Sequence, residues 1–390
     1  MKIFVPNKFI PYGRQTISSK DVQAVAKALR SEYLTTGPRV RQFEEKLAAY
    51  CGARYAVVCS SGTAALHLSC LALGLKEKDS IVTSPITFLA TANCARYVGA
   101  EVAFTDIDER TANLDPGKLS QTLRRTRNVK AIFPVHFAGN PAEMEGIFHV
   151  ARKKGLKIVE DACHALGASY RTRNGQTIKV GSCYHSDMTV FSFHPIKTIT
   201  TGEGGAITTN DERFYQRLLL FRNHGMEKKG NADPWAYEMN EVGFNYRLTD
   251  IQCALGVSQL KEVTRFVAHR RETASFYDKE FKDAKFFRTP FTDKRTRSSY
   301  HLYPLRVDFR ALKKTRRDVM RELASRGIGT QVHYIPLTRQ PYYRKRYGLK
   351  PRDYPCAEKY YEQTLSIPIY PFLSPPDRHR ITTQVKKVCA

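Results

Sequence analysis

Two residues that can do chemistry together, Asp161 and Lys197, each follow an apolar run that predicts a buried strand. Asp161 closes the run 156–161, and Lys197 lies between the run 188–193 and a glycine-rich turn at 201–205. Residues just past the carboxyl ends of neighbouring parallel strands share one cleft. A lysine there can hold an aldehyde as a Schiff base, and an aspartate can keep a pyridine nitrogen protonated, as pyridoxal phosphate requires. Taken alone, the pair could equally be a surface lysine and a helix-capping aspartate.

Small residues at 60–66 predict a phosphate site between a strand and a helix. Gly62 lets backbone N–H groups approach a phosphate at the positive end of the helix, and Thr63 adds a hydroxyl. The pattern is weak by itself, because many helices begin with Ser-Gly-Thr without binding an anion. Ser192, on the strand before Lys197, offers a second hydroxyl. Phe88 offers a ring to stack on an aromatic cofactor, although a plain core aromatic is the alternative.

Strands and helices are expected to alternate through the first two thirds of the chain. The predicted strands are 55–59, 80–83, 101–105, 129–134, 157–160, 189–193 and 206–208. Helices are expected at 22–30, capped by residues 18–21, at 40–50 and from 63 onwards. This alternation predicts an α/β fold in which a mainly parallel, seven-stranded sheet is covered on both faces.

The C-terminal third predicts a smaller α+β domain. Helical patterns at 248–263 and 268–281 lead into a strand at 301–307, a helix at 315–326 and a strand at 329–334. We therefore divide the chain into a large domain, 1–258, and a small domain, 259–390. The polar stretch 223–245 between the helices is long enough to be a functional loop.

Composition excludes several classes of protein. A hydrophobic content of 42% over 390 residues permits a large core, and nine scattered cysteines without a C-x-x-C pair indicate neither a disulfide framework nor a zinc site. Residues 1–8 become polar too early to provide the apolar segment of a signal peptide. No apolar run reaches the ~18 residues that a membrane helix needs. We expect a soluble, cytoplasmic protein. Its net charge of +26 suits anionic small molecules or, as a rival hypothesis, nucleic acid.

The motifs together resemble those of the DegT/DnrJ/EryC1/StrS family of sugar aminotransferases. The resemblance is carried almost throughout the chain, by residues 60–63, 85–93, 160–167, 191–205, 223–226, 243–256 and 331–334. It implies the fold type I architecture of pyridoxal-phosphate enzymes, which is that of aspartate aminotransferase. The cofactor implied is pyridoxal 5′-phosphate.

The resemblance also implies a role for each matching residue. Lys197 corresponds to the Schiff-base lysine, Asp161 to the partner of the pyridine nitrogen, and His164 to a side chain near the cofactor's phenolic oxygen. The expected phosphate cradle and stacking ring come from Gly62, Thr63, Ser192 and Phe88.

Two further matches, Asn245 and Arg247, imply an obligate homodimer. In the family, an asparagine at the position of Asn245 reaches the phosphate of the neighbouring subunit's cofactor, so the active sites lie at the interface. Arg247, two residues on, is expected to do likewise. The clearest departure from the family pattern is Cys163, which stands where Ala or Ser is common beneath the ring. A thiol fits there, and we expect it to be tolerated while sensitising the site to oxidation.

Within the family, residues 224–229, 258–261 and 331–336 resemble the branch that serves pseudaminic acid biosynthesis. That branch uses L-glutamate to aminate C4 of a UDP-linked 4-keto-6-deoxy sugar, UDP-2-acetamido-2,6-dideoxy-β-L-arabino-hex-4-ulose, which gives UDP-4-amino-4,6-dideoxy-N-acetyl-β-L-altrosamine. His333 and Tyr334 would then line the sugar-nucleotide pocket, whereas the alternative for His333 is a structural hydrogen bond in a strand.

Three rival functions remain open at this stage. The first is another nucleotide-keto-sugar aminotransferase, acting at C4 or C3 of a dTDP or GDP sugar. The second is a dehydratase of the same fold, which Lys197 disfavours because those relatives carry histidine in its place. The third is a nucleic-acid-binding regulator that has kept the fold, which the net charge of +26 would suit.

Overall fold

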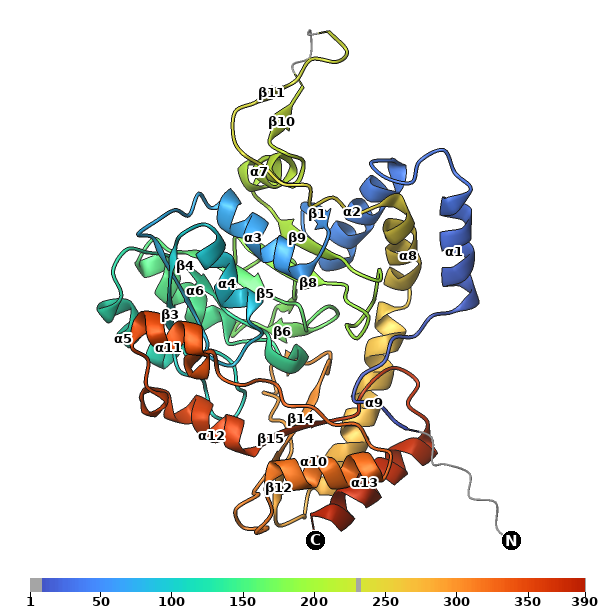
Figure 1. Cartoon of the computed structure of the whole chain (residues 1–390), viewed down its shortest axis with the longest axis vertical. Coiled ribbons are helices and arrows are strands. Elements are labelled where there is room, and N and C mark those ends of the chain that lie inside the picture. The colour runs from blue at the N-terminus through green and yellow to red at the C-terminus, as the bar shows by residue number, and fades with distance from the viewer. Residues whose placement is uncertain (1–8, 229–232, 390) are drawn as a thin grey trace.

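A seven-stranded sheet forms the centre of the structure, a computed structural model that describes residues 9–228 and 233–389 (Figure 1). The order of the strands is β1-β9-β8-β5-β4-β2-β3, and only β9 runs antiparallel to its neighbours. The strands are β1 (Tyr55–Cys59), β2 (Ser80–Thr83), β3 (Glu101–Phe104), β4 (Val129–Phe133), β5 (Lys157–Asp161), β8 (Met188–Ser192) and β9 (Gly205–Thr209). Each matches a predicted strand to within one residue at either end, so the mainly parallel sheet is confirmed.

Helices cover both faces of this sheet because consecutive strand residues point to opposite sides. Val57 packs on one face with α3 (Gly62–Ala72), α4 (Ala90–Tyr97) and α7 (Glu212–Arg222). Val58 packs on the other face with α2 (Pro38–Cys51) and α8 (Asp250–Leu260). Further along that second face lie α5 (Pro116–Arg125) and α6 (Met144–Lys153).

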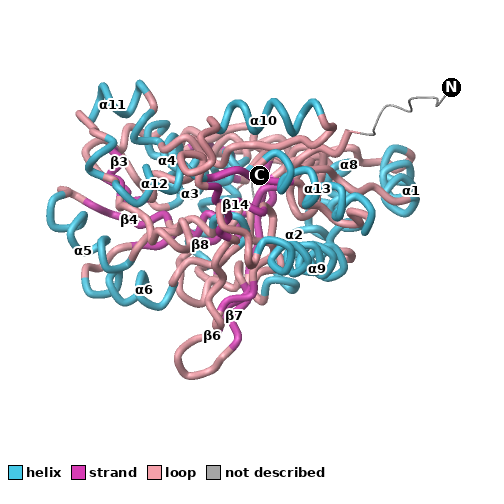
Figure 2. The backbone as a smooth tube through the Cα atoms, turned by 90° about the horizontal axis from the view of Figure 1, so that it is seen from below, coloured by secondary structure: helices cyan, strands magenta, loops and turns pink. Residues whose placement is uncertain are grey.

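A small antiparallel sheet and three helices enclose a separate core towards the C-terminus. The sheet consists of β12 (Phe287–Arg288), β14 (Tyr303–Val307) and β15 (Thr364–Ile367). It packs against α10 (Arg316–Ser325), α13 (Pro375–Val388) and the second half of α9 (Val263–Phe281). Figure 2 shows α9 and α13 side by side, where Arg378 bonds Glu272. The first half of α9 belongs to the core of the large sheet, so this one helix connects both cores.

Two late helices return to the large sheet, although they lie more than 230 residues after its edge strand. In Figure 1, α11 (Pro341–Tyr347) and α12 (Pro355–Gln363) lie beside β3 and α5. The Tyr347 hydroxyl donates to Glu101 of β3 at 2.7 Å, and the Ala357 N–H donates to Asp106 at 2.9 Å. The domain division at 258/259, which falls inside α8, remains a prediction.

The remaining elements are one helix of 11 residues, several short strands and three 3-10 turns. They are α1 (Ser19–Leu29), β6 (Ser169–Arg171), β7 (Thr177–Lys179), β10 (Met226–Glu227), β11 (Glu238–Met239) and β13 (Thr296–Arg297), with 3-10 turns η1 (Phe137–Gly139), η2 (Leu337–Arg339) and η3 (Pro351–Asp353). The expected cap of α1 is confirmed, since Ser18 and Asp21 form a capping box. Among the described residues, no helix is long and apolar enough to cross a membrane.

Some sequence predictions were wrong or only partly testable. The strand expected at 329–334 does not form; only Gln331 makes an isolated bridge, to Ser366. The helical patterns at 248–263 and 268–281 become α8 and α9, which are separated at Lys261 and Glu262. Part of the loop predicted at 223–245 forms the β10–β11 hairpin, but residues 229–232 lie outside the described residues, as do the first eight of the chain.

The buried carboxylate of Asp250 fastens α2 to α8, and its loss should destabilise the fold. It accepts hydrogen bonds from the N–H groups of Gly37 (2.7 Å) and Arg39 (2.9 Å) at the start of α2. Asp250→Ala leaves both groups without their acceptor, so we expect a loss of about 2–4 kcal/mol in the free energy of unfolding, measured by urea titration. The matched control is Asp211→Ala, which removes the partly exposed cap of α7 and should cost about 1 kcal/mol. Equal losses from the two variants would contradict this assignment.

Candidate active site

A cavity of about 740 Å³ opens at the carboxyl ends of β5 and β8. Its walls come from the large sheet, the N-terminal segment at Tyr12 and the C-terminal segment 331–340. Nearly all the residues predicted for the site line it, namely Gly62, Thr63, Phe88, Asp161, His164, Ser192, Lys197, His333 and Tyr334. The structure therefore brings together residues that are spread over more than 270 positions of the chain.

Asp161 ends β5 and presents a buried, hydrogen-bonded carboxylate to the cavity. Its Oδ2 accepts from the Thr91 hydroxyl at 2.6 Å, and its Oδ1 accepts from the Cys163 N–H at 3.1 Å. The Thr91 hydroxyl is itself within 2.7 Å of the Thr87 hydroxyl. These bonds fix the orientation of the carboxylate, which faces the same cavity as Lys197.

Lys197 supplies the amine of the site. Burial lowers the pKa of its ammonium group, and the nearby Cys163 and Asp161 only partly oppose that shift. Within the described part of the chain, the Lys197 side chain has no hydrogen-bond or ion-pair partner. An amine with a lowered pKa is more often neutral and is therefore a better nucleophile and base.

The start of α3 forms the predicted anion cradle. Ser61 caps the helix by accepting from the Ala64 N–H at 3.0 Å, which leaves the N–H groups of Gly62 and Thr63 without acceptors among the described residues. A Cβ at Gly62 would lie only 2.9 Å from the Cβ of Ser192, so glycine lets this turn sit against β8. Two free N–H groups and the hydroxyls of Thr63 and Ser192 are donors suited to a phosphate.

Cys163 lies beneath the cavity and touches the cradle. A Cβ at Gly62 would lie 3.2 Å from its sulfur. Burial, together with the neighbouring Asp161, raises the pKa of the thiol well above its usual value. Because the thiolate is the reactive form, this shift of the pKa opposes oxidation of the thiol, whereas Cys163 also lines the cavity, so its oxidation sensitivity stays a prediction.

Three histidines lie close to Lys197, and burial lowers the pKa of each. His164 and His301 are both held well below the usual value, and the pKa of His333 is lowered to about 3 by burial and by Lys197. His333 also lies within 2.8 Å of the Ser366 hydroxyl through Nδ1, so it lines the cavity and makes a structural hydrogen bond at once. All three rings are expected to be neutral at pH 7.

Asn245 and Arg247 do not reach this cavity. Asn245 is exposed and forms a bridge with Asn223, while Arg247 donates to the Asn223 side chain at 2.7 Å and borders a second cavity of about 660 Å³. Sequence reasoning missed Tyr12, whose ring lies 5.5 Å from that of His333, because no motif marks the N-terminal segment. Thr91 was contained in the motif 85–93 but was given no role.

Comparison with known proteins identifies the family. The profile of the DegT/DnrJ/EryC1/StrS aminotransferase family matches residues 15–386. The chain belongs to this family. It is 41% identical over 363 residues to a Campylobacter jejuni UDP-4-amino-4,6-dideoxy-N-acetyl-β-L-altrosamine transaminase, covering 93% of this chain and 92% of that one.

Solved structures of family members agree with the fold and the cofactor. Helicobacter pylori PseC, an aminotransferase of pseudaminic acid biosynthesis, superposes with a TM-score of 0.90 at 34% identity, over 98% of this chain and 99% of that one. The PLP-form of the Streptococcus pneumoniae putative sugar aminotransferase Spr1654 superposes with a TM-score of 0.89 at 29% identity, over 98% of each chain. This DegT-family protein is therefore a sugar aminotransferase of fold type I whose cofactor is pyridoxal 5′-phosphate, and the free amine, buried carboxylate and anion cradle of its cavity fit that cofactor.

The neutral histidines make the stability of this DegT-family protein depend on pH. The unfolded chain binds a proton at His333 below about pH 6.5, whereas the folded protein does so only near pH 3. The contribution of His333 to the free energy of unfolding is therefore fully present above about pH 6.5. It is lost as the pH falls, by up to ~1.4 kcal/mol per pH unit. His333→Gln should reduce the slope of unfolding free energy against pH between 6 and 4.5 by about that amount. The exposed His149 gives the control, since His149→Gln should leave the slope as it is. An unchanged slope in His333→Gln would show that His333 is not buried in its neutral form.

Proposed function

We propose that this aminotransferase moves the amino group of L-glutamate to C4 of UDP-2-acetamido-2,6-dideoxy-β-L-arabino-hex-4-ulose. The observation that carries the proposal is the unpartnered Lys197 amine, which shares a cavity with the buried Asp161 carboxylate. The choice of sugar is supported by the 41% identity to the C. jejuni transaminase. Both substrates are metabolites of the cytoplasm, so we place the enzyme there.

Lys197 is the proposed catalytic base and the attachment point for the cofactor. When bound, pyridoxal phosphate supplies an electron sink for the negative charge that develops at Cα of the amino donor. The lowered pKa leaves the Lys197 amine able to take the proton from that Cα. The same amine, once protonated, can return a proton to C4 of the sugar in the second half of the reaction.

Asp161 and the start of α3 are the proposed cofactor-binding groups. Asp161 provides the anion beside the ring nitrogen and is oriented by its bonds to Thr91 and to the Cys163 N–H. The donors of Gly62, Thr63 and Ser192 hold the phosphate. Phe88, which lines the cavity and is 55% exposed, would stack on the cofactor ring, and His164, which also lines the cavity, would contact the phenolic oxygen as the family resemblance implies.

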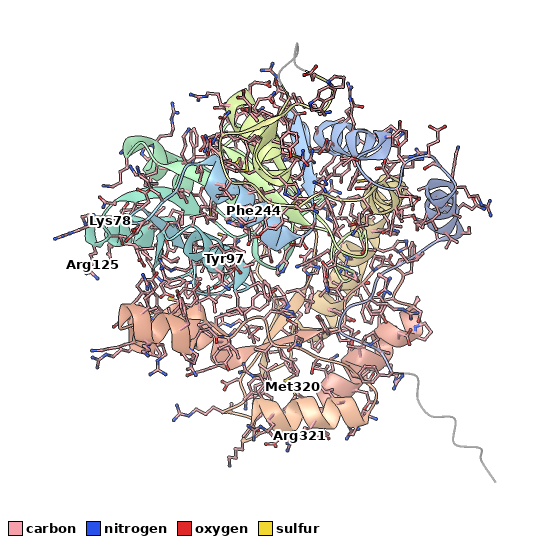
Figure 3. The ribbon with its side chains drawn as sticks, turned by 45° about the horizontal axis from the view of Figure 1, so that its top comes forward. Lys78, Tyr97, Arg125, Phe244, Met320 and Arg321 are labelled. Carbon is pink, nitrogen blue, oxygen red and sulfur yellow. The ribbon has the colours of Figure 1, made fainter. Side chains whose placement is uncertain are left out.

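The proposed homodimer would complete each site with residues of the second subunit. Asn245 is exposed and cannot reach the cavity of its own chain. Its neighbour in the chain, Phe244, belongs to an aromatic cluster with His67, Tyr97 and Tyr246, and Figure 3 shows Tyr97 and Phe244 close together. His67 contacts both rings, and Tyr97 is 53% exposed. A second copy packed on this apolar surface would receive Asn245 and Arg247 next to its own cofactor phosphate.

His333 and Tyr334 are proposed to contact the sugar nucleotide. Both lie on the wall of the cavity contributed by the C-terminal segment, where Tyr334 also contacts His164 of the large domain. The surplus of positive charge on the chain favours the approach of a UDP diphosphate.

The direct test supplies purified, cofactor-loaded protein with L-glutamate and the UDP-keto sugar. Mass spectrometry should detect the 4-amino sugar together with 2-oxoglutarate. Lys197→Ala should reduce turnover by at least ~10³-fold because both the attachment point and the base are lost. Lys179→Ala is the matched control, because it also replaces a lysine but lies outside the cavity. Its turnover should stay within twofold of the wild-type value. Turnover retained by Lys197→Ala would refute the mechanism, whereas preference for a dTDP or GDP keto sugar would correct only the substrate.

Subunit mixing tests the shared site separately. The Lys197→Ala and Arg247→Ala proteins should each be inactive or nearly so as homodimers. After they are mixed and allowed to exchange subunits, each heterodimer carries one site without either substitution, so activity should rise towards roughly a quarter of the wild-type value. If Arg247 serves the cavity of its own chain, no heterodimer contains an intact site and mixing will restore nothing.

A further inference from the structure

The buried ring of His164 is held in one tautomer by a backbone group. The Ala138 N–H donates to its Nδ1 at 3.3 Å, and an N–H group can only donate, so Nδ1 carries no proton. Burial, with the nearby Lys197 and His333, lowers the pKa of His164 well below its usual value, so the ring is neutral. Its single proton is therefore on Nε2.

That tautomer determines where Tyr334 directs its own proton. The His164 Nε2 lies 3.1 Å from the Tyr334 oxygen and donates to it. Burial raises the pKa of Tyr334 well above its usual value, so the hydroxyl keeps its proton. In residues 9–228 and 233–389 no group accepts a hydrogen bond from this hydroxyl, and Tyr334 lines the cavity. Its proton is thus available to an oxygen atom bound inside the cavity.

The donor to His164 belongs to a turn, η1, that needs support. Ala138 has a φ of +57°, in the left-handed region that alanine rarely adopts. Asn113 clamps both ends of the turn, because its Oδ1 accepts from the Phe137 N–H at 2.9 Å and its Nδ2 donates to the Asn140 carbonyl at 3.0 Å. Asn113 is almost wholly buried and does not line the active-site cavity.

A second clamp holds the residue just before the turn, His136. The Ala142 N–H donates to its Nδ1 at 3.0 Å, which leaves the proton on Nε2, 2.5 Å from Glu160. Although burial alone would raise the pKa of Glu160, the bonds from His136, Ser186 and Thr189 hold it below the usual value. Glu160 is adjacent to Asp161 in β5 but points to the other face of the sheet.

We propose that the η1 turn sets the tautomer of His164 and thereby aims the Tyr334 proton into the cavity, with Asn113 and the Glu160–His136 pair as the positioning residues that hold the turn. In the other tautomer, Nδ1–H would oppose the Ala138 N–H, and Nε2 would accept the Tyr334 proton. The cavity would then lose a hydrogen-bond donor. The proposal deepens the proposed function and rests on it for the catalytic effect, but the tautomer itself exists without turnover.

The first experiment observes the tautomer directly by NMR. The full-length protein is labelled with ¹⁵N-histidine, and the His164 signals are assigned from their absence in His164→Gln, with and without bound cofactor. The wild type should show a protonated Nε2 and an unprotonated Nδ1. Glu160→Gln and Asn113→Ala should each shift His164 towards a mixture of tautomers. A protonated Nδ1 in the wild type would overturn the proposal whatever the enzyme's substrate proves to be.

The second experiment asks whether both clamps act through His164. Glu160→Gln and Asn113→Ala should each lower kcat roughly 10-fold, with less change in KM. When His164→Gln is already present, Glu160→Gln and Asn113→Ala should each lower kcat less than twofold. The glutamine amide carries its donor and its acceptor on separate atoms, so it has no tautomer for the clamps to set. Equal losses in both backgrounds would show that the clamps do not act through His164.

A matched control separates positioning from stability. Tyr170→Phe removes another buried bond of the large domain, the 2.7 Å contact between the Tyr170 hydroxyl and His185, but leaves η1 intact. It should leave kcat and the His164 tautomer unchanged. A 10-fold loss of kcat in Tyr170→Phe would mean that any buried bond lost from this region has the same effect. Should the His164→Gln protein be inactive, the NMR result alone decides.

Discussion

The register of β5 against β8 is the constraint on which the site depends. Glu160 pairs with Thr189 and Asp161 with Val190, so two adjacent carboxylates point to opposite faces of the sheet. Each is buried and has its own partners: Thr91 and a backbone N–H for Asp161, and His136, Ser186 and Thr189 for Glu160. A slip by one residue would exchange the two faces and leave both carboxylates without their partners, at a cost of several kcal/mol.

With the register set, the rest of the chain assembles around the end of these two strands. The start of α3 lies against β8 because Gly62 and Gly205 leave room for the Ser61 turn, where a Cβ at Gly205 would meet the Ser61 carbonyl at 2.3 Å. The C-terminal segment contributes His333 and Tyr334 to the cavity wall. Helices α11 and α12 fix that segment to the edge of the large sheet, so the substrate wall is tied to the same framework as the catalytic residues.

Much of this architecture could be predicted from the sequence because its signals are local. Apolar runs marked the seven strands, and the positions of Asp161 and Lys197 at strand ends placed them in one cleft. The segment 329–334 was predicted wrongly as a strand, since several of its residues line the cavity wall and Gln331 alone of the segment forms a β-bridge. Tyr12, Asn113 and the His136–Glu160 pair were not predicted because their roles come from contacts between distant segments, which no local pattern records.

The proposed mechanism requires that the Lys197 amine, and no other amine of the chain, carries the cofactor. Borohydride reduction of the cofactor-loaded protein, followed by proteolysis and mass spectrometry, tests it most directly because reduction makes the link to the lysine permanent. We expect a phosphopyridoxyl group on the peptide that contains Lys197, and its disappearance when L-glutamate is added before reduction. A label on a different lysine, or no label on any peptide, would show that Lys197 does not hold the cofactor.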